Sequence, residues 1–132
     1  MTEVSAAIFI ENNKVLLAKR SPEKNLGGYW EFPGGKRENN ETILECLERE
    51  IFEELNVKCK AIEIFCENMH ENERGAIKLI AIISELIDRE IILKDHSDYE
   101  WVEINRILSY KLAPADIFIA ELLIAKYNQL PE

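Results

Sequence analysis

Residues 34–57 read GGKRENNETILECLEREIFEELNV and carry the strongest structural signal in the 132-residue chain. It combines two glycines, ten charged side chains and a strong helix signal. Thr42 and Glu45 have the spacing of a capping box, in which the threonine hydroxyl accepts from the N–H three residues on and the glutamate reaches back. An apolar stripe follows at spacings of three and four residues, made of Leu44, Leu47, Ile51 and Leu55. The pattern predicts one amphipathic helix.

Three carboxylates lie beside that stripe, because Glu50, Glu53 and Glu54 stand at i, i+3 and i+4. Like charges at such spacings cost about 0.2–0.5 kcal/mol per pair. Mg²⁺ takes oxygen ligands and makes the same cluster favourable. For an arbitrary helix a solvated acidic face is the alternative. The Gly-Gly-Lys ahead of this helix and Arg49 within it favour a metal site.

The stretch resembles the Nudix box, Gly-x5-Glu-x7-Arg-Glu-U-x-Glu-Glu-x-Gly-U, in which U is a bulky aliphatic residue. Eight positions match without insertion or deletion: Gly35, Glu41, Arg49, Glu50, Ile51, Glu53, Glu54 and Val57. The last glycine of the box is Asn56 here. That glycine follows the helix and usually needs a positive φ, which Asn tolerates best among the other residues. We therefore expect Asn56 to end the helix in its place.

The resemblance implies a Nudix fold of the α+β class, an α/β/α sandwich with a mixed β-sheet between helices, and we expect residues 1–132 to form it as a single domain. It also implies hydrolysis of a nucleoside diphosphate linked to another group. The run WEFPGGK at residues 30–36 is similar to that of MutT-like relatives, which cleave a (d)NTP to the monophosphate and pyrophosphate. We expect a Mg²⁺-dependent pyrophosphohydrolase of the nucleotide pool, with a cytidine-type or an oxidised substrate such as 8-oxo-dGTP. Mn²⁺ is the expected substitute ion.

The same resemblance assigns catalytic roles to residues of the box and to one residue outside it: Glu50, Glu53, Glu54, Arg49 and Glu100. It implies that the Gly34 carbonyl binds metal together with four carboxylates, those of Glu50, Glu53, Glu54 and Glu100. Arg49 would orient the box glutamates, and either Glu50 or Glu100 would take the proton of the attacking water. Asp98 is the alternative to Glu100, which directly precedes Trp101. The framework of the box comprises Gly35, Glu41, Ile51, Asn56 and Val57.

Five residues are expected to contact the substrate: Arg20, Phe32, Gly35, Lys36 and Asp116. Arg20 ends a predicted strand, where an arginine is otherwise simply solvated; by the resemblance, it and Lys36 would contact phosphates. Asp116 ends the run LAPAD, which resembles the segment that contacts the nucleobase in MutT-like enzymes. A carboxylate accepts hydrogen bonds, so it suits an exocyclic amine such as cytosine N4 or the N1/N2 edge of guanine. The alternative is an acid that merely favours a helix N-terminus.

The rest of the chain predicts short strands and a final helix. Apolar, β-branched runs predict a hairpin from Val4–Ile10 and Val15–Ala18. Further strands are expected at Lys58–Cys66, at Ala76–Ile83, around Glu90–Leu93 and after His96, with a polar connection over residues 67–75. Residues 112–116 are expected to open the last helix, because Pro114 suits a first helical turn.

Composition limits the partners. The formal net charge of −9 repels a nucleic-acid backbone, so no long nucleic acid is expected, whereas a nucleotide that arrives with Mg²⁺ is acceptable. The three cysteines lack metal-ligand spacing, which indicates reduced thiols and a cytoplasmic protein. No apolar run approaches the length of a membrane span, so no membrane partner is expected. Monomer and homodimer both stay open.

Other functions stay open as alternatives. Other Nudix branches cleave ADP-ribose, coenzyme A, dinucleoside polyphosphates or sugar nucleotides. ADP-ribose cleavers tend to carry a proline downstream of the box, where residues 71–73 read ENE. A non-catalytic nucleotide-binding module is the alternative from another class. Such a module usually lacks a box glutamate, and all of them are present here.

Overall fold

The computed structural model describes residues 1–127. Its regular elements are β1 (Thr2–Glu11), β2 (Lys14–Arg20), β3 (Trp30–Glu31), α1 (Ile43–Leu55), β4 (Cys59–Asn72), β5 (Gly75–Leu86), β6 (His96–Glu103), two 3₁₀ helices (Ile104–Ser109 and Pro114–Asp116) and α2 (Ile117–Tyr127). The strands form a six-stranded sheet in the order β3-β2-β1-β5-β4, with β6 paired to β2. The β1–β5 pair is parallel and the other pairs are antiparallel.

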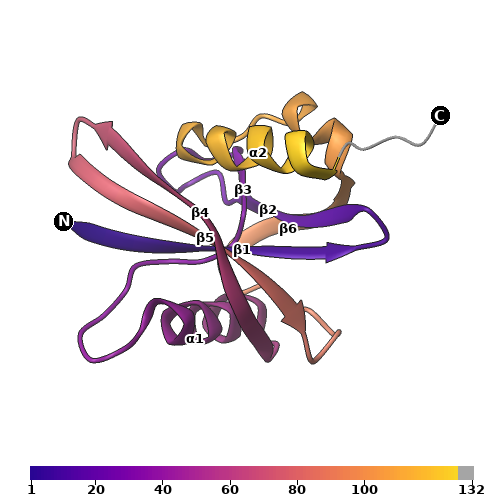
Figure 1. Cartoon of the computed structure of the whole chain (residues 1–132), viewed down its shortest axis with the longest axis horizontal. Helices are drawn as coiled ribbons and strands as arrows, with labels where there is room; N and C mark the ends of the chain where they lie inside the picture. The colour runs from indigo at the N-terminus through magenta and orange to yellow at the C-terminus, as the bar shows by residue number, and fades with distance from the viewer. Residues whose placement is uncertain (128–132) are drawn as a thin grey trace.

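Helices cover both faces of this sheet. Figure 1 shows α1 on one face and α2 on the opposite face. The predicted stripe of α1 is buried at Leu47, Ile51 and Leu55, which pack on one side of β1 and β5. The second core lies between the sheet and α2 and contains Leu17 and Leu123. The mixed sheet between helices confirms the predicted α+β sandwich.

The glycine-containing loop before α1 lies against the sheet because β1 and β2 separate. β1 and β2 pair only next to their turn, where Ile10 lies opposite Val15 and Glu11 opposite Lys14. The other end of β2 pairs with β3. The following loop runs along β1, where the N–H of Ser5 donates to the Gly35 carbonyl at 2.8 Å and the N–H of Ala7 donates to the Pro33 carbonyl at 2.7 Å. The glycine loop is thereby fixed against a central strand.

Both ends of α1 form as predicted. The N–H of Glu45 donates to the Thr42 hydroxyl at 3.1 Å, and the N–H of Thr42 donates to the Glu45 carboxylate at 2.8 Å, which completes the capping box. Asn56 ends the helix in the left-handed region, with φ 59° and ψ 30°, and its N–H donates to the Phe52 carbonyl. The asparagine therefore does what the family's glycine does.

Two predicted segments are wrong. The strand expected around Glu90–Leu93 is absent, since its backbone binds the end of α1: the N–H of Ile92 donates to the Leu55 carbonyl, and that of Lys94 to the Glu54 carbonyl. The polar connection expected over residues 67–75 is mostly strand, because β4 continues to Asn72 and pairs along its length with β5. Cross-strand pairing outweighs the polar character of these residues.

The cysteines are free, as predicted, with Cys46 and Cys59 buried and Cys66 half-buried. Burial raises the pKa of the Cys59 thiol to about 12 and that of Cys66 to about 11. These thiols therefore have little thiolate character. Within residues 1–127, no helix is both long and apolar enough to cross a membrane.

Candidate active site

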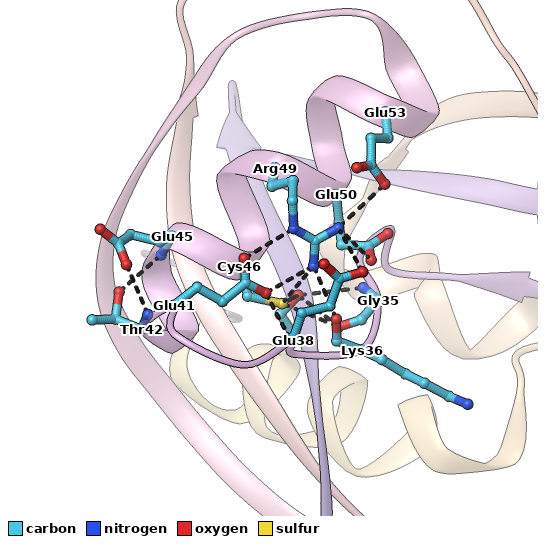
Figure 2. Close-up of polar contacts among 11 residues, drawn as sticks. Gly35, Lys36, Glu38, Glu41, Thr42, Glu45, Cys46, Arg49, Glu50 and Glu53 are labelled. Atoms are coloured by element: carbon cyan, nitrogen blue, oxygen red, sulfur yellow. Dashed lines mark hydrogen bonds and ion pairs between the residues drawn. The ribbon is translucent and has the colours of Figure 1, made fainter.

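Arg49 is the centre of a charge network that joins the loop to α1 (Figure 2). Its Nε and Nη2 donate to the two carboxylate oxygens of Glu41 at 2.9 and 2.8 Å. Its Nη1 donates to Glu50 at 3.1 Å and to Glu53 at 3.2 Å, and its Nη2 also donates to the Lys36 carbonyl at 3.1 Å. The hydrogen bond from Arg49 lowers the pKa of Glu41 to about 2. Arg49 thus sets the positions of three carboxylates and one loop carbonyl.

The two glycines of the loop allow very close packing. A Cβ on Gly35 would lie 2.3 Å from the carboxyl carbon of Glu50. A Cβ on Gly34 would lie 2.0 Å from the carbonyl oxygen of Ser5. Glycine at these positions therefore brings the backbone of the loop against β1 on one side and against an acid of α1 on the other.

Glu54 is a half-buried acid whose Oε1 is inaccessible and has no hydrogen-bond partner within the described residues. Burial raises the pKa of this carboxyl to about 9, and a hydrogen bond with Glu50 and the charge of Glu31 act in the same direction. A buried polar atom without a partner is destabilising by about 1–3 kcal/mol. A cation at this oxygen would remove that penalty, because it favours the ionised carboxylate.

The residues at this place fit a divalent cation of the hard type. Oxygen atoms dominate the donor set, which includes the unpartnered oxygen of Glu54 and the carboxylates of Glu50 and Glu53. In the described part of the chain, no group of three or more His, Cys, Asp or Glu side chains is arranged to hold a metal ion. Mg²⁺ commonly binds through one or two carboxylates, waters and substrate phosphates, so three preformed protein ligands are not needed.

Two cavities adjoin at this place; Glu54 lines the first of them, whereas Glu50 and Glu53 line neither. The first, of about 520 Å³, is called the polar cavity here, and its walls include Arg20, Glu31, Gly34, Gly35, Lys36, Glu54, Asp95 and His96. The second, of about 380 Å³, is called the apolar cavity, and its walls include Leu26, Glu31, Phe32, Gly34, Leu79, Ala113 and Asp116. Eight residues line both cavities, so the cavities adjoin along them: Val4, Asn25, Leu26, Glu31, Gly34, Asn72, Arg74 and Ile77.

Arg20 and Glu31 form one side of the polar cavity together with His96. Nη1 of Arg20 is 3.3 Å from Oε1 of Glu31, and Nε2 of His96 is 2.8 Å from Oε2 of Glu31. Nε of Arg20 also donates to the carbonyl of Asn25 at 2.6 Å. Nδ1 of His96 is buried and has no hydrogen-bond partner within the described residues. Arg20 is therefore held at the cavity rather than free in solvent.

Asp116 lies in the wall of the apolar cavity and is nearly inaccessible. Its Oδ2 accepts from the backbone N–H of Phe32 at 2.8 Å. Burial raises the pKa of this carboxyl to about 8, and the charge of Glu31 raises it further, while the hydrogen bond from Phe32 opposes the shift. Phe32 belongs to the α2-side core as well as to the cavity, so it has both a packing and a lining position.

Glu100 is not brought to the box. It pairs with Leu17 in the β6–β2 register, and Leu17 packs in the α2-side core. Its neighbours Tyr99 and Trp101 pack in the α1-side core, so strand alternation turns Glu100 to the α2 side. There it accepts a hydrogen bond from the Tyr110 hydroxyl. Glu100 and the alternative acid, Asp98, line neither cavity.

The structure adds residues to the polar cavity that sequence reasoning did not select: Glu31, Asp95 and His96. The sequence could have indicated that Glu31 faces away from the core, because it stands between two core aromatics, Trp30 and Phe32, in an extended segment. Alternation turns the middle residue away from that core. His96 had no such signal, because its contact with Glu31 joins residues 65 positions apart.

Residues 1–123 match the NUDIX domain family. The chain is 34% identical over 125 residues to a CTP pyrophosphohydrolase of Escherichia coli, covering 95% of this chain and 93% of that protein. It is 28% identical to an 8-oxo-dGTP diphosphatase of Escherichia coli, covering 91% of this chain and 90% of that protein. The solved structure of the E. coli ORF135 protein superposes with a TM-score of 0.84 at 32% identity, covering 100% of this chain and 95% of that one. The chain therefore belongs to the NUDIX domain family and is a Nudix hydrolase.

Proposed function

We propose that this protein hydrolyses a nucleoside triphosphate to the nucleoside monophosphate and pyrophosphate with the help of Mg²⁺. Cytidine triphosphates are the first candidates, and oxidised guanine triphosphates are the second. Relatives named CTP pyrophosphohydrolase and 8-oxo-dGTP diphosphatase support this order. We place the reaction in the cytoplasm, where three free thiols stay reduced.

The observation that carries the proposal is the junction of two unlike cavities. The polar cavity combines the side chains of Arg20 and Lys36 with the half-buried acid Glu54. The apolar cavity beside it has Asp116 in its wall. A nucleotide has the same division, since its phosphates need cations and its base needs an apolar pocket with a few polar groups. ADP-ribose and sugar nucleotides, which carry a second sugar beyond the phosphates, are the alternative substrates.

Phosphoryl chemistry at this site depends on positioning and on neutralising charge. The Gly34 carbonyl and the carboxylates of Glu50, Glu53 and Glu54 would hold Mg²⁺, which supplies charge neutralisation at the phosphates and a more acidic water. Arg20 and Lys36 would bind phosphate oxygens. Glu50, which Arg49 holds at 3.1 Å, is our candidate for the group that takes the proton of the attacking water.

Asp116 is proposed to contact the nucleobase. Its Oδ2 already binds the Phe32 N–H, and its Oδ1 makes no hydrogen bond within the described residues. A carboxylate oxygen accepts, and cytosine presents its N4 amino group as a donor. If the high pKa keeps the carboxyl protonated, the group also donates, which matches the N3 acceptor of cytosine. Asp116→Ala should therefore change base preference more than phosphate chemistry.

The test is hydrolysis with Mg²⁺ across canonical and modified (d)NTPs and ADP-ribose, with pyrophosphate and phosphate release measured separately. We expect pyrophosphate release, fastest for one base class. Turnover of ADP-ribose alone would assign the protein to another Nudix branch, and inactivity on the whole panel would favour a binding module. Glu53→Gln should lower turnover strongly, whereas Glu63→Gln, an exposed acid on β4, serves as the matched control and should not.

A further inference from the structure

Resting on the proposed nucleotide hydrolysis, we propose that Glu31 binds the sugar of the substrate: its carboxylate accepts a hydrogen bond from a ribose hydroxyl and so makes the enzyme sensitive to the sugar. The proposal depends on where Glu31 lies, on how it is held and on which lone pairs remain available.

Glu31 lies where the sugar of a bound nucleotide must lie. It lines the polar cavity, which holds the groups for phosphates, and also the apolar cavity, which holds the groups for a base. In a nucleotide the sugar joins phosphates to base. A residue common to both cavities is therefore placed beside the sugar when each end occupies its own cavity. The shared residues with polar side chains are Asn25, Glu31, Asn72 and Arg74, and Glu31 is the one carboxylate among them.

The carboxylate of Glu31 is held in a fixed orientation. Oε1 is 3.3 Å from Nη1 of Arg20, and Oε2 is 2.8 Å from Nε2 of His96. The backbone of Glu31 is fixed as well, because it pairs with Ala18 of β2. A side chain held at both oxygens and at its backbone loses little further freedom when it binds a ligand.

Glu31 retains acceptor capacity in spite of these two contacts. A carboxylate has about four lone-pair sites, two on each oxygen. Arg20 and His96 use one on each oxygen, so each oxygen can accept one more hydrogen bond. A ribose hydroxyl is a donor and fits this requirement, whereas a phosphate oxygen or a carbonyl does not. The acceptor chemistry therefore excludes phosphate oxygens and carbonyls. A sugar hydroxyl and a base amino group remain as donors, and the position of Glu31 beside both cavities favours the sugar.

The test compares four sugars on the triphosphate of the preferred base: ribose, 2′-deoxyribose, 3′-deoxyribose and 2′,3′-dideoxyribose. The measured quantity is kcat/KM for pyrophosphate release, for the unaltered protein and for Glu31→Gln. Glu31→Asp is a second variant that keeps the charge but shortens the side chain, and Glu63→Gln on β4 is the matched control. Thermal unfolding of each variant checks that it folds.

We expect the unaltered protein and Glu63→Gln to lose about ten- to a hundredfold in kcat/KM on the dideoxy sugar relative to ribose, the range for a hydrogen bond to a charged group. The two monodeoxy sugars identify which hydroxyl is bound. In Glu31→Gln and Glu31→Asp the ratio of ribose to dideoxyribose should fall severalfold towards one.

Equal loss on all four sugars in the Glu31 variants would overturn the proposal and show that Glu31 acts on the phosphates or only supports Arg20. So would a ratio near one in the unaltered protein. These results would leave nucleotide hydrolysis intact. Failure of the unaltered protein on every triphosphate overturns the proposed function and this inference with it, so the two failures are distinguishable.

Discussion

Gly35 and Glu50 pack against each other so closely that a Cβ on the glycine would lie 2.3 Å from the carboxyl carbon of the glutamate. The glutamate carboxyl is the flexible end of a side chain, and it can move aside. The backbone of the loop is fixed by its bonds to β1, including Ser5 N–H to the Gly35 carbonyl at 2.8 Å. The contact therefore bears on the position of a proposed active-site acid more than on the fold.

Gly35→Ala should remove most activity while the protein still folds. The added methyl group displaces the Glu50 carboxylate, and a displacement of about 1 Å at a catalytic group can lower the rate by about a hundredfold. The measurement is kcat for pyrophosphate release, with thermal unfolding in parallel. Asn39→Ala, an exposed residue of the same loop, is the control and should leave kcat unchanged. Activity of Gly35→Ala equal to that of the control would contradict the close packing.

Arg49→Lys should raise the Mg²⁺ concentration that gives half-maximal activity and should lower kcat. A lysine has one ammonium group and cannot bind Glu41 at both oxygens while it also binds Glu50 and Glu53. The carboxylates would then lose their fixed orientation. Activity is measured against Mg²⁺ concentration. Arg37→Lys alters an exposed ion pair with Glu3 in the same loop, and this control should show an unchanged Mg²⁺ dependence.

Asn56→Gly should leave stability unchanged within about 1 kcal/mol, and Asn56→Ala should lower it by about 1–2 kcal/mol. The reason is the left-handed backbone at this residue, with φ 59°, which alanine adopts at a cost and glycine does not. The measurement is the free energy of unfolding from urea titrations. Equal stability of the glycine and alanine variants would show that the helix end relaxes out of this conformation.

Asp116 should make the fold less stable as pH rises. Its pKa is about 8 in the folded protein and 3.8 in the ordinary state, so the folded state keeps a proton that the unfolded state releases. The stabilisation of the folded state by this proton is fully present below about pH 4 and is lost as pH rises through about 8. Between these values the free energy of unfolding should fall by about 1 kcal/mol for each pH unit.

The measurement is thermal unfolding from pH 4 to 8 in the presence of a chelator, for the unaltered protein and for Asp116→Asn. The asparagine keeps an oxygen for the Phe32 N–H but does not titrate. We expect the difference in Tm between the two proteins to grow in favour of the variant as pH rises. Parallel curves would show that Asp116 is ionised in the folded protein over this range.

Much of α1 followed from the sequence by itself, because its signals are local. The capping box, the buried stripe of Leu47, Ile51 and Leu55, and the helix end at Asn56 all involve residues within a few positions of one another. The box motif with its fixed spacing also predicted the NUDIX domain family. The network of Arg49 with Glu41, Glu50 and Glu53 lies within the same stretch.

The tertiary structure decided what depends on partners far away in the chain. Glu100 was predicted to bind metal or to activate water, but the β6–β2 register turns it to the α2 side. A strand has two faces, and the sequence around one acid does not say which face it takes. The segment around Ile92 is not the predicted strand, because its backbone N–H donates to the Leu55 carbonyl at the end of α1. Two further contacts form only once the sheet has formed: the hydrogen bond from the Phe32 N–H to Asp116 and the contact between His96 and Glu31. Local pattern fixes the helix and its acids, whereas the walls of the two cavities come from contacts between residues dozens of positions apart.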